Sequence, residues 1–147
     1  MSMLFKCLAC LSVAITPAFP ANLGDPSPTG SDLGQAKSQI ERKDWSASIA
    51  KLEKYVKANP NDAEGFNLLG YSLRNAKRYP EAIKNYQEAL RLDPQHRGAH
   101  EYLGQAYVQL KEFDKAKALL DSLETICGAQ CPQYLDLKKA IDKATKP

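Results

Sequence analysis

The sequence of 147 residues has little of several features that mark particular classes of protein. It contains four cysteines, two histidines and one tryptophan, and its acidic and basic residues nearly balance, leaving a formal charge of +3. A charge this small does not indicate nucleic acid or an acidic membrane as an obligatory partner. Apolar residues make up 44% of the chain and charged residues 25%, so the composition argues against wholesale disorder and favours one globular domain.

Long apolar runs are also missing. The one apolar stretch, Cys7 to Ile15, follows the lone charge of Lys6 and is about half as long as the ~20 residues that a membrane-spanning helix needs. Small residues follow it at Ala18 and Ala21, as in a secretory signal peptide. We therefore expect residues 1–21 to be a signal peptide rather than a permanent anchor, cleaved after one of these alanines, and the protein to be periplasmic or secreted.

Removal of this segment leaves two cysteines, Cys127 and Cys131, in the mature chain. Two cysteines in an exported protein indicate one disulfide, and the chain-entropy argument gives so small a loop about 2 kcal/mol of stabilisation. A reversible redox pair and a metal site are the alternatives. The spacing is not the Cys-x2-Cys of thioredoxin-like proteins, and no second cysteine pair or histidine cluster completes a zinc site.

Residues 22–30 are rich in proline and glycine, which deny the backbone regular pairing. We expect this segment to be a flexible lead-in, with ordered structure beginning near Ser31.

The remaining chain repeats itself at intervals of 34 residues. Small and apolar residues recur in matched pairs: Leu69 and Leu103, Gly70 and Gly104, Ala82 and Ala116, Pro60 and Pro94. An aromatic series follows the same interval, at Trp45, Tyr79 and Phe113. The small residues predict places where the two helices of a pair cross closely, and the prolines predict helix ends.

This pattern resembles the tetratricopeptide repeat (TPR) family, whose 34-residue helix-turn-helix unit carries W-x2-L-G-x2-Y, then A-x3-F and then P. The units are residues 29–62, 63–96 and 97–130, which span 31–130 of the ordered chain, and the middle unit is the closest copy. The first is degenerate, because Gln35 and Gln39 stand where its first helix should be apolar. The resemblance implies an all-α, right-handed superhelical solenoid of three hairpins.

A capping helix is expected over residues 132–147. Tyr134, Leu137 and Ile141 lie at helical spacing with lysines on the other faces, and Pro132 suits a first helical turn. The cysteine pair ahead of this helix resembles small exported TPR proteins of Gram-negative bacteria. Such a cap is needed because each hairpin buries its apolar face only against its neighbours.

The TPR resemblance implies a concave groove, lined by the first helix of each pair, that binds peptides or protein segments. In the middle unit, Asn67, Tyr71 and Arg74 form the stripe beside the buried residues. Asn67 can hydrogen-bond an extended backbone, and Arg74 can hold a carboxylate. A shift of 34 residues either way extends the stripe to Leu33, Lys37, Ile40, Glu101, Gln105 and Val108. The alternative is that these side chains form an ordinary solvated face.

The best-known ligand of the family, a C-terminal carboxylate clamped by paired Lys and Asn residues, is not expected here. Leu33 and Lys37 do not supply the Lys-then-Asn pair, and Gly98 leaves the third unit without a basic residue at its start. His96 and His100 lie four residues apart, but the segment lacks the Glu of the zinc-protease motif, and His100 occupies the repeat's aromatic position.

No nucleophile elbow, phosphate loop, paired-acid signature or dinucleotide fingerprint appears, and basic residues alternate with acids. The sequence therefore predicts a non-catalytic interaction adaptor of the cell envelope, without a cofactor, a nucleic-acid partner or stable membrane insertion. It would be a monomer or a weak homo-oligomer. The alternative function is a thiol-redox or metal-handling accessory factor using Cys127 and Cys131.

Overall fold

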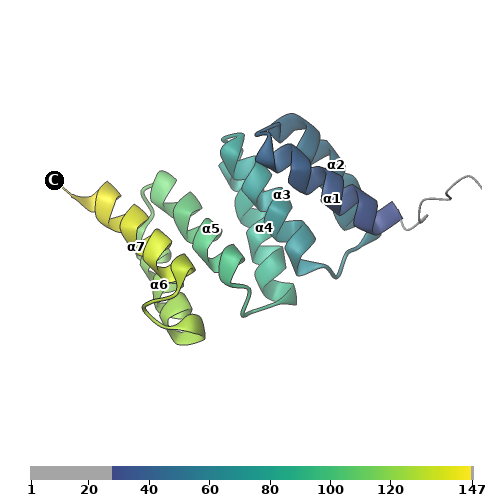
Figure 1. Ribbon diagram of the computed structural model, residues 1–147. Helices are drawn as coiled ribbons and strands as arrows, with labels where there is room; N and C mark the ends of the chain where they lie inside the picture. The colour runs from purple at the N-terminus through teal and green to yellow at the C-terminus, as the bar shows by residue number, and fades with distance from the viewer. Residues whose placement is uncertain (1–27, 147) are drawn as a thin grey trace, which may run out of the picture.

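The computed structural model describes residues 28–146, and every regular element in this range is an α-helix. The helices stack side by side into one elongated assembly (Figure 1). Their bounds are α1 (Pro28–Glu41), α2 (Trp45–Ala58), α3 (Ala63–Asn75), α4 (Tyr79–Leu92), α5 (Arg97–Gln109), α6 (Phe113–Cys127) and α7 (Pro132–Thr145). The stack of helical hairpins confirms the predicted all-α solenoid.

The start of the ordered chain differs slightly from the expectation. Helix α1 begins at Pro28, three residues before the predicted start near Ser31. Proline suits this position because its fixed φ matches a helix and its missing N–H needs no partner in the first turn. The predicted signal peptide, residues 1–21, and residues 22–27 of the lead-in lie outside the described residues.

Three hairpins pair α1 with α2, α3 with α4, and α5 with α6. Each turns through one lysine with a left-handed backbone: Lys43 at φ 59°, Lys77 at 66° and Lys111 at 61°. Between hairpins, short links end in a capping residue. Asp62 accepts a hydrogen bond from the Glu64 N–H at the start of α3, which satisfies one of the unpaired amides of a helix N-terminus.

The core runs the length of the stack between the helices. Its largest fully buried side chains include Leu52, Tyr86, Leu123 and Leu137. One polar contact crosses it, where the Ser48 hydroxyl of α2 donates to the Ser72 hydroxyl of α3 over 3.1 Å. Continuous burial across all hairpins explains why no unit is stable alone.

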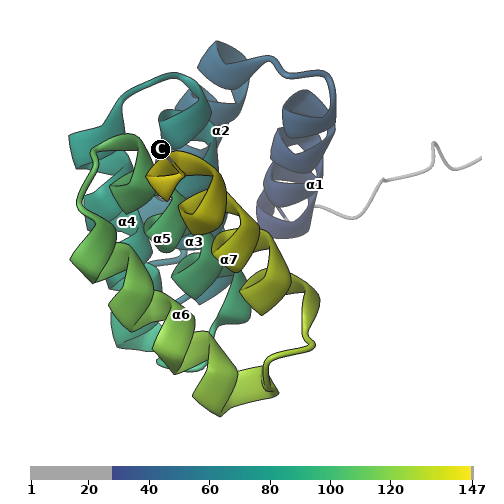
Figure 2. The same ribbon diagram turned by 90° about the vertical axis from the view of Figure 1, so that its left-hand side faces the viewer.

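Helix α7 closes the stack as predicted, and it does so in register with the repeats. Leu137 stands 34 residues after Leu103, and α7 contacts both α5 and α6 (Figure 2). A Cβ added to Gly104 would lie 2.5 Å from Leu137, whereas one added to Gly70 would lie 2.7 Å from Tyr86 of its own hairpin. The prediction that both glycines serve the crossing within a pair is therefore wrong for Gly104, since α7 takes up its space.

Candidate functional site

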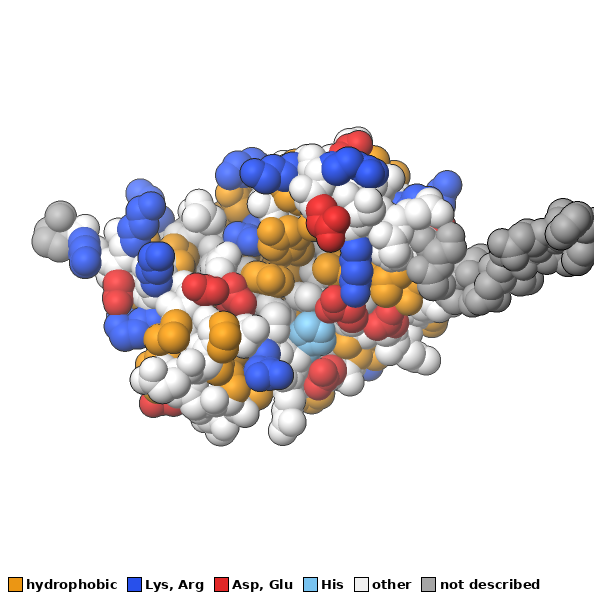
Figure 3. Space-filling model, in the orientation of Figure 1, with side chains coloured by type: hydrophobic (Ala, Val, Ile, Leu, Met, Phe, Trp, Pro, Cys, Tyr) orange, Lys and Arg blue, Asp and Glu red, His pale blue; other side chains and the backbone are white. Residues whose placement is uncertain are grey.

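The first helices of the hairpins and α7 form one face of the molecule, which we call the groove face. Helices α1 and α7 stand out at its two ends, and α3 and α5 lie set back between them (Figure 2). Viewed from this side, hydrophobic side chains gather at the centre, with charged side chains of both signs around them (Figure 3). The face is therefore concave and mixed in character.

Aromatic rings from three helices meet at the centre of the groove face. The ring centroids of Tyr71 and Tyr102 are 5.0 Å apart, and Trp45 contacts Tyr71 edge-on at 6.1 Å. The guanidinium of Arg74 lies over both tyrosines, 5.4 Å from the Tyr71 centroid and 5.6 Å from that of Tyr102. Such a position holds the cation in place while leaving it able to meet a negative group.

Arg74 also reaches below the rings. Its Nε is buried without a hydrogen-bond partner of regular geometry, as is the hydroxyl of Tyr86. Burial raises the pKa of Tyr86, and the positive charge of Arg74 opposes this rise, so the two groups lie close together. Arg74 is thus fixed by packing and by π contacts, and it forms no ion pair within residues 28–146.

A polar network joins three helices at one side of these rings. The Glu64 carboxylate accepts a hydrogen bond from Asn67 Nδ2 at 3.1 Å and lies 3.3 Å from His96 Nε2 and 3.6 Å from Lys37 Nζ. Asn67 is only 4% exposed, and its Oδ1 has no partner. Since a buried acceptor without a donor is costly, Asn67 Oδ1 is a candidate to receive an N–H from a bound segment.

The protonation of His96 follows from its two contacts. Its Nδ1 accepts the Ala99 N–H at the start of α5, so in the neutral ring the proton sits on Nε2 and is donated to Glu64. The hydrogen bond with Glu64 raises the pKa of His96, and the same contact lowers the pKa of Glu64. This pair ties α3 to α5 beneath the groove face.

Glu101 of α5 is a buried acid in the groove stripe, only 7% exposed. Its Oε1 accepts a hydrogen bond from Gln105 Nε2 at 2.8 Å. Burial, and secondly the charge of Asp136 on α7, raise the pKa of Glu101 to about 7, while the charge of Arg74 opposes the rise. The side chain is therefore partly protonated near neutral pH.

The structure brings most of the predicted stripe to the groove face but buries three of its members. Lys37 is exposed, and Tyr71, Arg74 and Gln105 are partly exposed, as are Leu33 and Ile40. Asn67 and Glu101 are buried, and Val108, at 6% exposure, packs within the hydrophobic core. The assignment of Val108 to the groove lining is therefore wrong, because adjacent hairpins pack closely enough to cover it.

Sequence reasoning missed four groups that shape this face: Trp45, Glu64, His96 and Tyr102. Tyr102 lies outside the predicted stripe because it is the neighbour of Glu101 rather than a member of the i, i+4, i+7 series. Glu64 and His96 occupy a helix start and a helix cap, where polar residues are ordinarily explained by capping. No periodicity in the sequence signals their contact across two hairpins.

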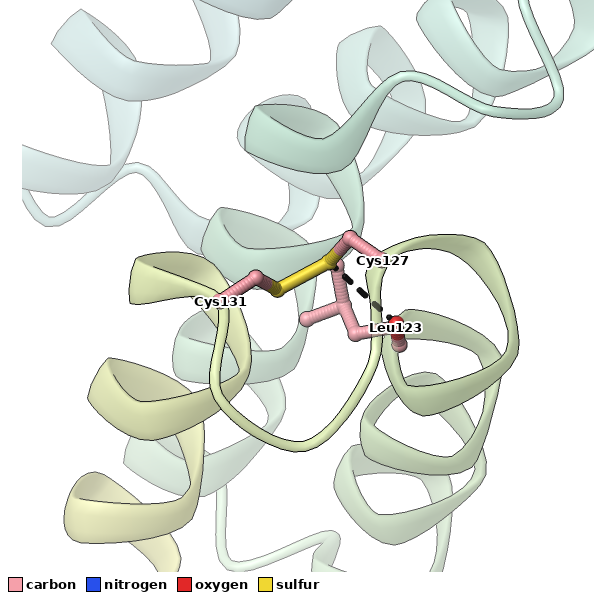
Figure 4. Close-up of a disulfide and its surroundings, with 3 residues drawn as sticks. All are labelled: Leu123, Cys127 and Cys131. Carbon is pink, nitrogen blue, oxygen red and sulfur yellow. Dashed lines mark hydrogen bonds between the residues drawn. A yellow bond between two sulfur atoms is a disulfide. The ribbon is translucent and has the colours of Figure 1, made fainter.

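The two cysteines are paired at the junction of α6 and α7 (Figure 4). Their Sγ atoms are 2.04 Å apart, and Cys131 is buried. Cys127 Sγ approaches the carbonyl oxygen of Leu123 at 3.3 Å, a contact without a hydrogen bond because a disulfide sulfur carries no proton. Gly128 ends α6 with φ of 82°, a backbone conformation that glycine adopts without strain.

Neither histidine takes part in a metal cluster within residues 28–146, where no group of three or more His, Cys, Asp or Glu side chains could hold a metal ion. His100 is buried, with Nε2 2.9 Å from the carbonyl oxygen of Pro94, which confirms its prediction as a packed side chain. Over the same part of the chain, no helix has the length and apolar character required to cross a bilayer.

Comparisons with known proteins agree with this architecture. Relatives with similar sequence include the mouse protein O-mannosyl-transferase TMTC3, 31% identical over 75 residues, and the yeast peroxisomal targeting signal receptor, 35% identical over 80 residues. These matches cover 51% and 54% of this chain. The chain spans only 8% and 13% of the lengths of those two relatives.

Solved TPR domains have a similar fold. The TPR2B domain of yeast Sti1, in a complex titled with pHsp70, superposes with a TM-score of 0.73 at 22% identity, over 80% of this chain and 95% of that one. The second TPR domain of human RPAP3, in complex with an HSP70 peptide, gives 0.72 at 17% identity, over 81% and 96%. MamA from Desulfovibrio magneticus gives 0.67 at 23% identity, over 72% and 60%.

Two family models match the chain, both described as tetratricopeptide repeat, over residues 33–96 and 73–141. Together they include all three hairpins and most of α7. The 34-residue register, the stacked hairpins and these matches together show that the chain belongs to the tetratricopeptide repeat family.

Proposed function

We propose that this protein is a non-catalytic adaptor that holds a segment of a partner protein on its groove face. The observation that carries this proposal is the centre of that face, where Arg74 lies on Tyr71 and Tyr102 without an ion-pair partner in residues 28–146. A fixed, partly dry cation beside aromatic rings favours a ligand that offers both a carboxylate and apolar contact.

The groove stripe has the dimensions of a short extended peptide. Asn67 and Arg74 are seven residues apart on α3, which corresponds to about 10 Å along a helix. An extended chain covers that distance in about three residues. A bound segment that donates a backbone N–H to Asn67 Oδ1 can therefore present an acidic side chain to Arg74 three residues away.

The structural neighbours support binding of this kind. The Sti1 and RPAP3 domains were solved with Hsp70-derived ligands, as their titles state. The clamp residues expected for such tails are absent from this chain, because Leu33 and Gly98 stand at their positions. We therefore propose a different internal or terminal segment as the ligand.

The place of action is part of the same proposal. An apolar stretch after Lys6 and small residues at Ala18 and Ala21 support export through a signal peptide, and a paired Cys127 and Cys131 fit an oxidising compartment. The intact mass and N-terminal sequence of protein recovered from an envelope fraction test this directly. An uncleaved N-terminus in the cytoplasmic fraction would contradict it.

The binding proposal is tested by selecting peptides from a random display library on the whole chain and measuring their affinities by calorimetry. Arg74→Gln should weaken the selected peptides about tenfold or more, since a charge-assisted contact is lost. Arg91→Gln is the matched control, because Arg91 is exposed on α4 and pairs with Glu88 within its own helix. Circular dichroism and melting should confirm that both variants fold.

Three results are possible. Loss of affinity in Arg74→Gln alone supports the groove as the site. Equal affinity in both variants and the parent places the selected peptides elsewhere and overturns the groove assignment. Failure to select any peptide, with a folded parent chain, argues against recognition of short segments altogether.

A further inference from the structure

One edge of the stack carries a row of lysines, which we call the lysine edge. Lys43, Lys77 and Lys111 occupy the turns within the three hairpins and repeat at intervals of 34 residues. All three are exposed, and none forms an ion pair within the described part of the chain. Because the hairpins stack regularly, the three charges form a line along the solenoid.

These lysines stand where the backbone favours a different residue. Their φ angles of 59°, 66° and 61° lie in the left-handed region, which glycine adopts freely and residues with a Cβ adopt only at a cost. The chain accepts this cost three times with the same basic side chain. Turn geometry alone does not account for that choice, so the side chain itself must serve a purpose at this edge.

Helix α7 extends the lysine edge beyond the last hairpin. Its contact with Gly104 through Leu137 keeps it in register with α5, so its C-terminal end, with Lys143 and Lys146, corresponds to the turn that holds Lys111. A shallow hollow of about 430 Å³ lies on α7 here. It is lined by Leu135, Lys138, Lys139, Asp142, Lys143 and Lys146.

Acidic residues near this edge are already engaged. Glu81 pairs with Arg78, Glu112 with Lys115, and Asp142 with Lys138. The lysines of the turns and of the α7 end are therefore left with unbalanced charge. The space-filling view shows basic side chains along this upper edge (Figure 3).

The exposed leucines lie with the same lysines. Within residues 32–146, the large hydrophobic side chains that are exposed are Leu110, at 39%, and Leu135, at 44%. Leu110 immediately precedes Lys111, and Leu135 lines the hollow with the lysines of α7. Lysines bordered by isolated exposed leucines are typical of surfaces that rest at a membrane–water interface.

We propose that the lysine edge docks this protein reversibly onto a bilayer that contains anionic lipids. A protein partner fits this edge less well, because the core of a protein interface is apolar and depleted of lysine, whereas only two leucines are exposed here. Anionic headgroups attract lysines through charge alone, and leucines can enter the headgroup layer. The surface is separate from the groove face and leaves a bound segment accessible.

The test is co-sedimentation of the whole chain with vesicles of phosphatidylcholine, with or without about one third phosphatidylglycerol. All variants carry the same N-terminal residues, so whatever those residues contribute is common to every arm. We expect tighter binding to the anionic vesicles and a loss of that difference at high salt, because salt screens the attraction.

The decisive variant is Lys43→Gly, Lys77→Gly, Lys111→Gly. Loss of about fivefold in affinity for each lysine gives a reduction on the order of a hundredfold on anionic vesicles. The same changes relieve the left-handed strain, so the melting temperature should not fall, which separates lost binding from lost folding. The control variant Lys54→Gln, Lys84→Gln, Lys117→Gln removes three exposed lysines, one from each second helix of a hairpin, and should bind far better than the glycine variant.

Equal binding to both kinds of vesicle, or equal losses in the two triple variants, would overturn the proposal. Binding to soluble polyglutamate but not to anionic vesicles would also overturn it, because the edge would then serve an acidic chain rather than a bilayer.

Discussion

The side chain of Leu137 occupies the space above Gly104, where an added Cβ would lie 2.5 Å from Leu137 Cδ2 and 2.7 Å from Cδ1. Leu137 is fully buried, so it has no room to move aside. This contact joins α7 to the last hairpin and converts a C-terminal helix into the closing layer of the solenoid.

Gly104→Ala should therefore lower the free energy of unfolding by about 1–3 kcal/mol, since the methyl group overpacks the α5–α7 contact. Urea denaturation followed by circular dichroism measures the change. Gly34→Ala is the control, because nothing lies within 4 Å of an added Cβ there, and alanine should stabilise α1 by about 0.5–1 kcal/mol. A neutral result for Gly104→Ala would show that α7 is not tightly docked.

The stability of the protein should fall as the pH rises from about 4.5 to about 7. In the folded state the pKa of Glu101 is raised from 4.5 to about 7, so the folded chain binds its proton more tightly than the unfolded chain in this interval. Glu101→Gln should remove this loss. It should leave stability at pH 4 nearly unchanged and raise it at pH 8 by about 1–3 kcal/mol.

Urea titrations at several pH values measure this effect. The exposed Glu124 provides the control, since Glu124→Gln should shift stability equally at pH 4 and pH 8. A Glu101→Gln variant with the same pH profile as the parent would mean that the carboxyl is not held in a buried, partly protonated state.

Lys77→Gly should stabilise the protein by about 0.5–1 kcal/mol, because the left-handed turn costs lysine more than glycine. The thermal midpoint by calorimetry should rise by a few degrees. Lys84→Gly, within the exposed face of α4, is the comparison and should destabilise by about 1 kcal/mol. Destabilisation by both substitutions would contradict the strained turn.

Replacing both Cys127 and Cys131 by serine should cost about 2 kcal/mol of stability, the value expected for a very short closed loop. Because the bridge lies at the entry of α7, hydrogen exchange should increase first in that helix. Peptide binding on the groove face should persist. Loss of the protein's biological activity with intact peptide binding would instead favour the thiol-redox function.

The 34-residue spacing was enough to predict the helices, the hairpins and the closing helix, because Leu69, Leu103 and their neighbours define local packing within a repeating unit. It was not enough to predict depth. An i, i+4, i+7 stripe fixes the direction of Asn67 and Val108 around their own helices, but burial depends on how closely the next hairpin lies. Likewise, a glycine at 104 indicates a close approach without saying that α7 makes it.

Contacts between residues far apart in the sequence were the least predictable part of the site. Glu64 and His96 meet across two hairpins, and Tyr102 joins Tyr71 although neither position repeats as an aromatic. Net charge was similarly uninformative, since an overall value of +3 conceals three unpaired lysines aligned in successive turns.

The edge-on contact of Trp45 with Tyr71 gives the protein a built-in optical reporter. Trp45 is the sole tryptophan of the chain, and its indole touches the ring on which Arg74 rests. A segment that settles on these rings will change the polarity around the indole. Its fluorescence can therefore follow occupation of the groove in real time, with no dye attached and no residue altered.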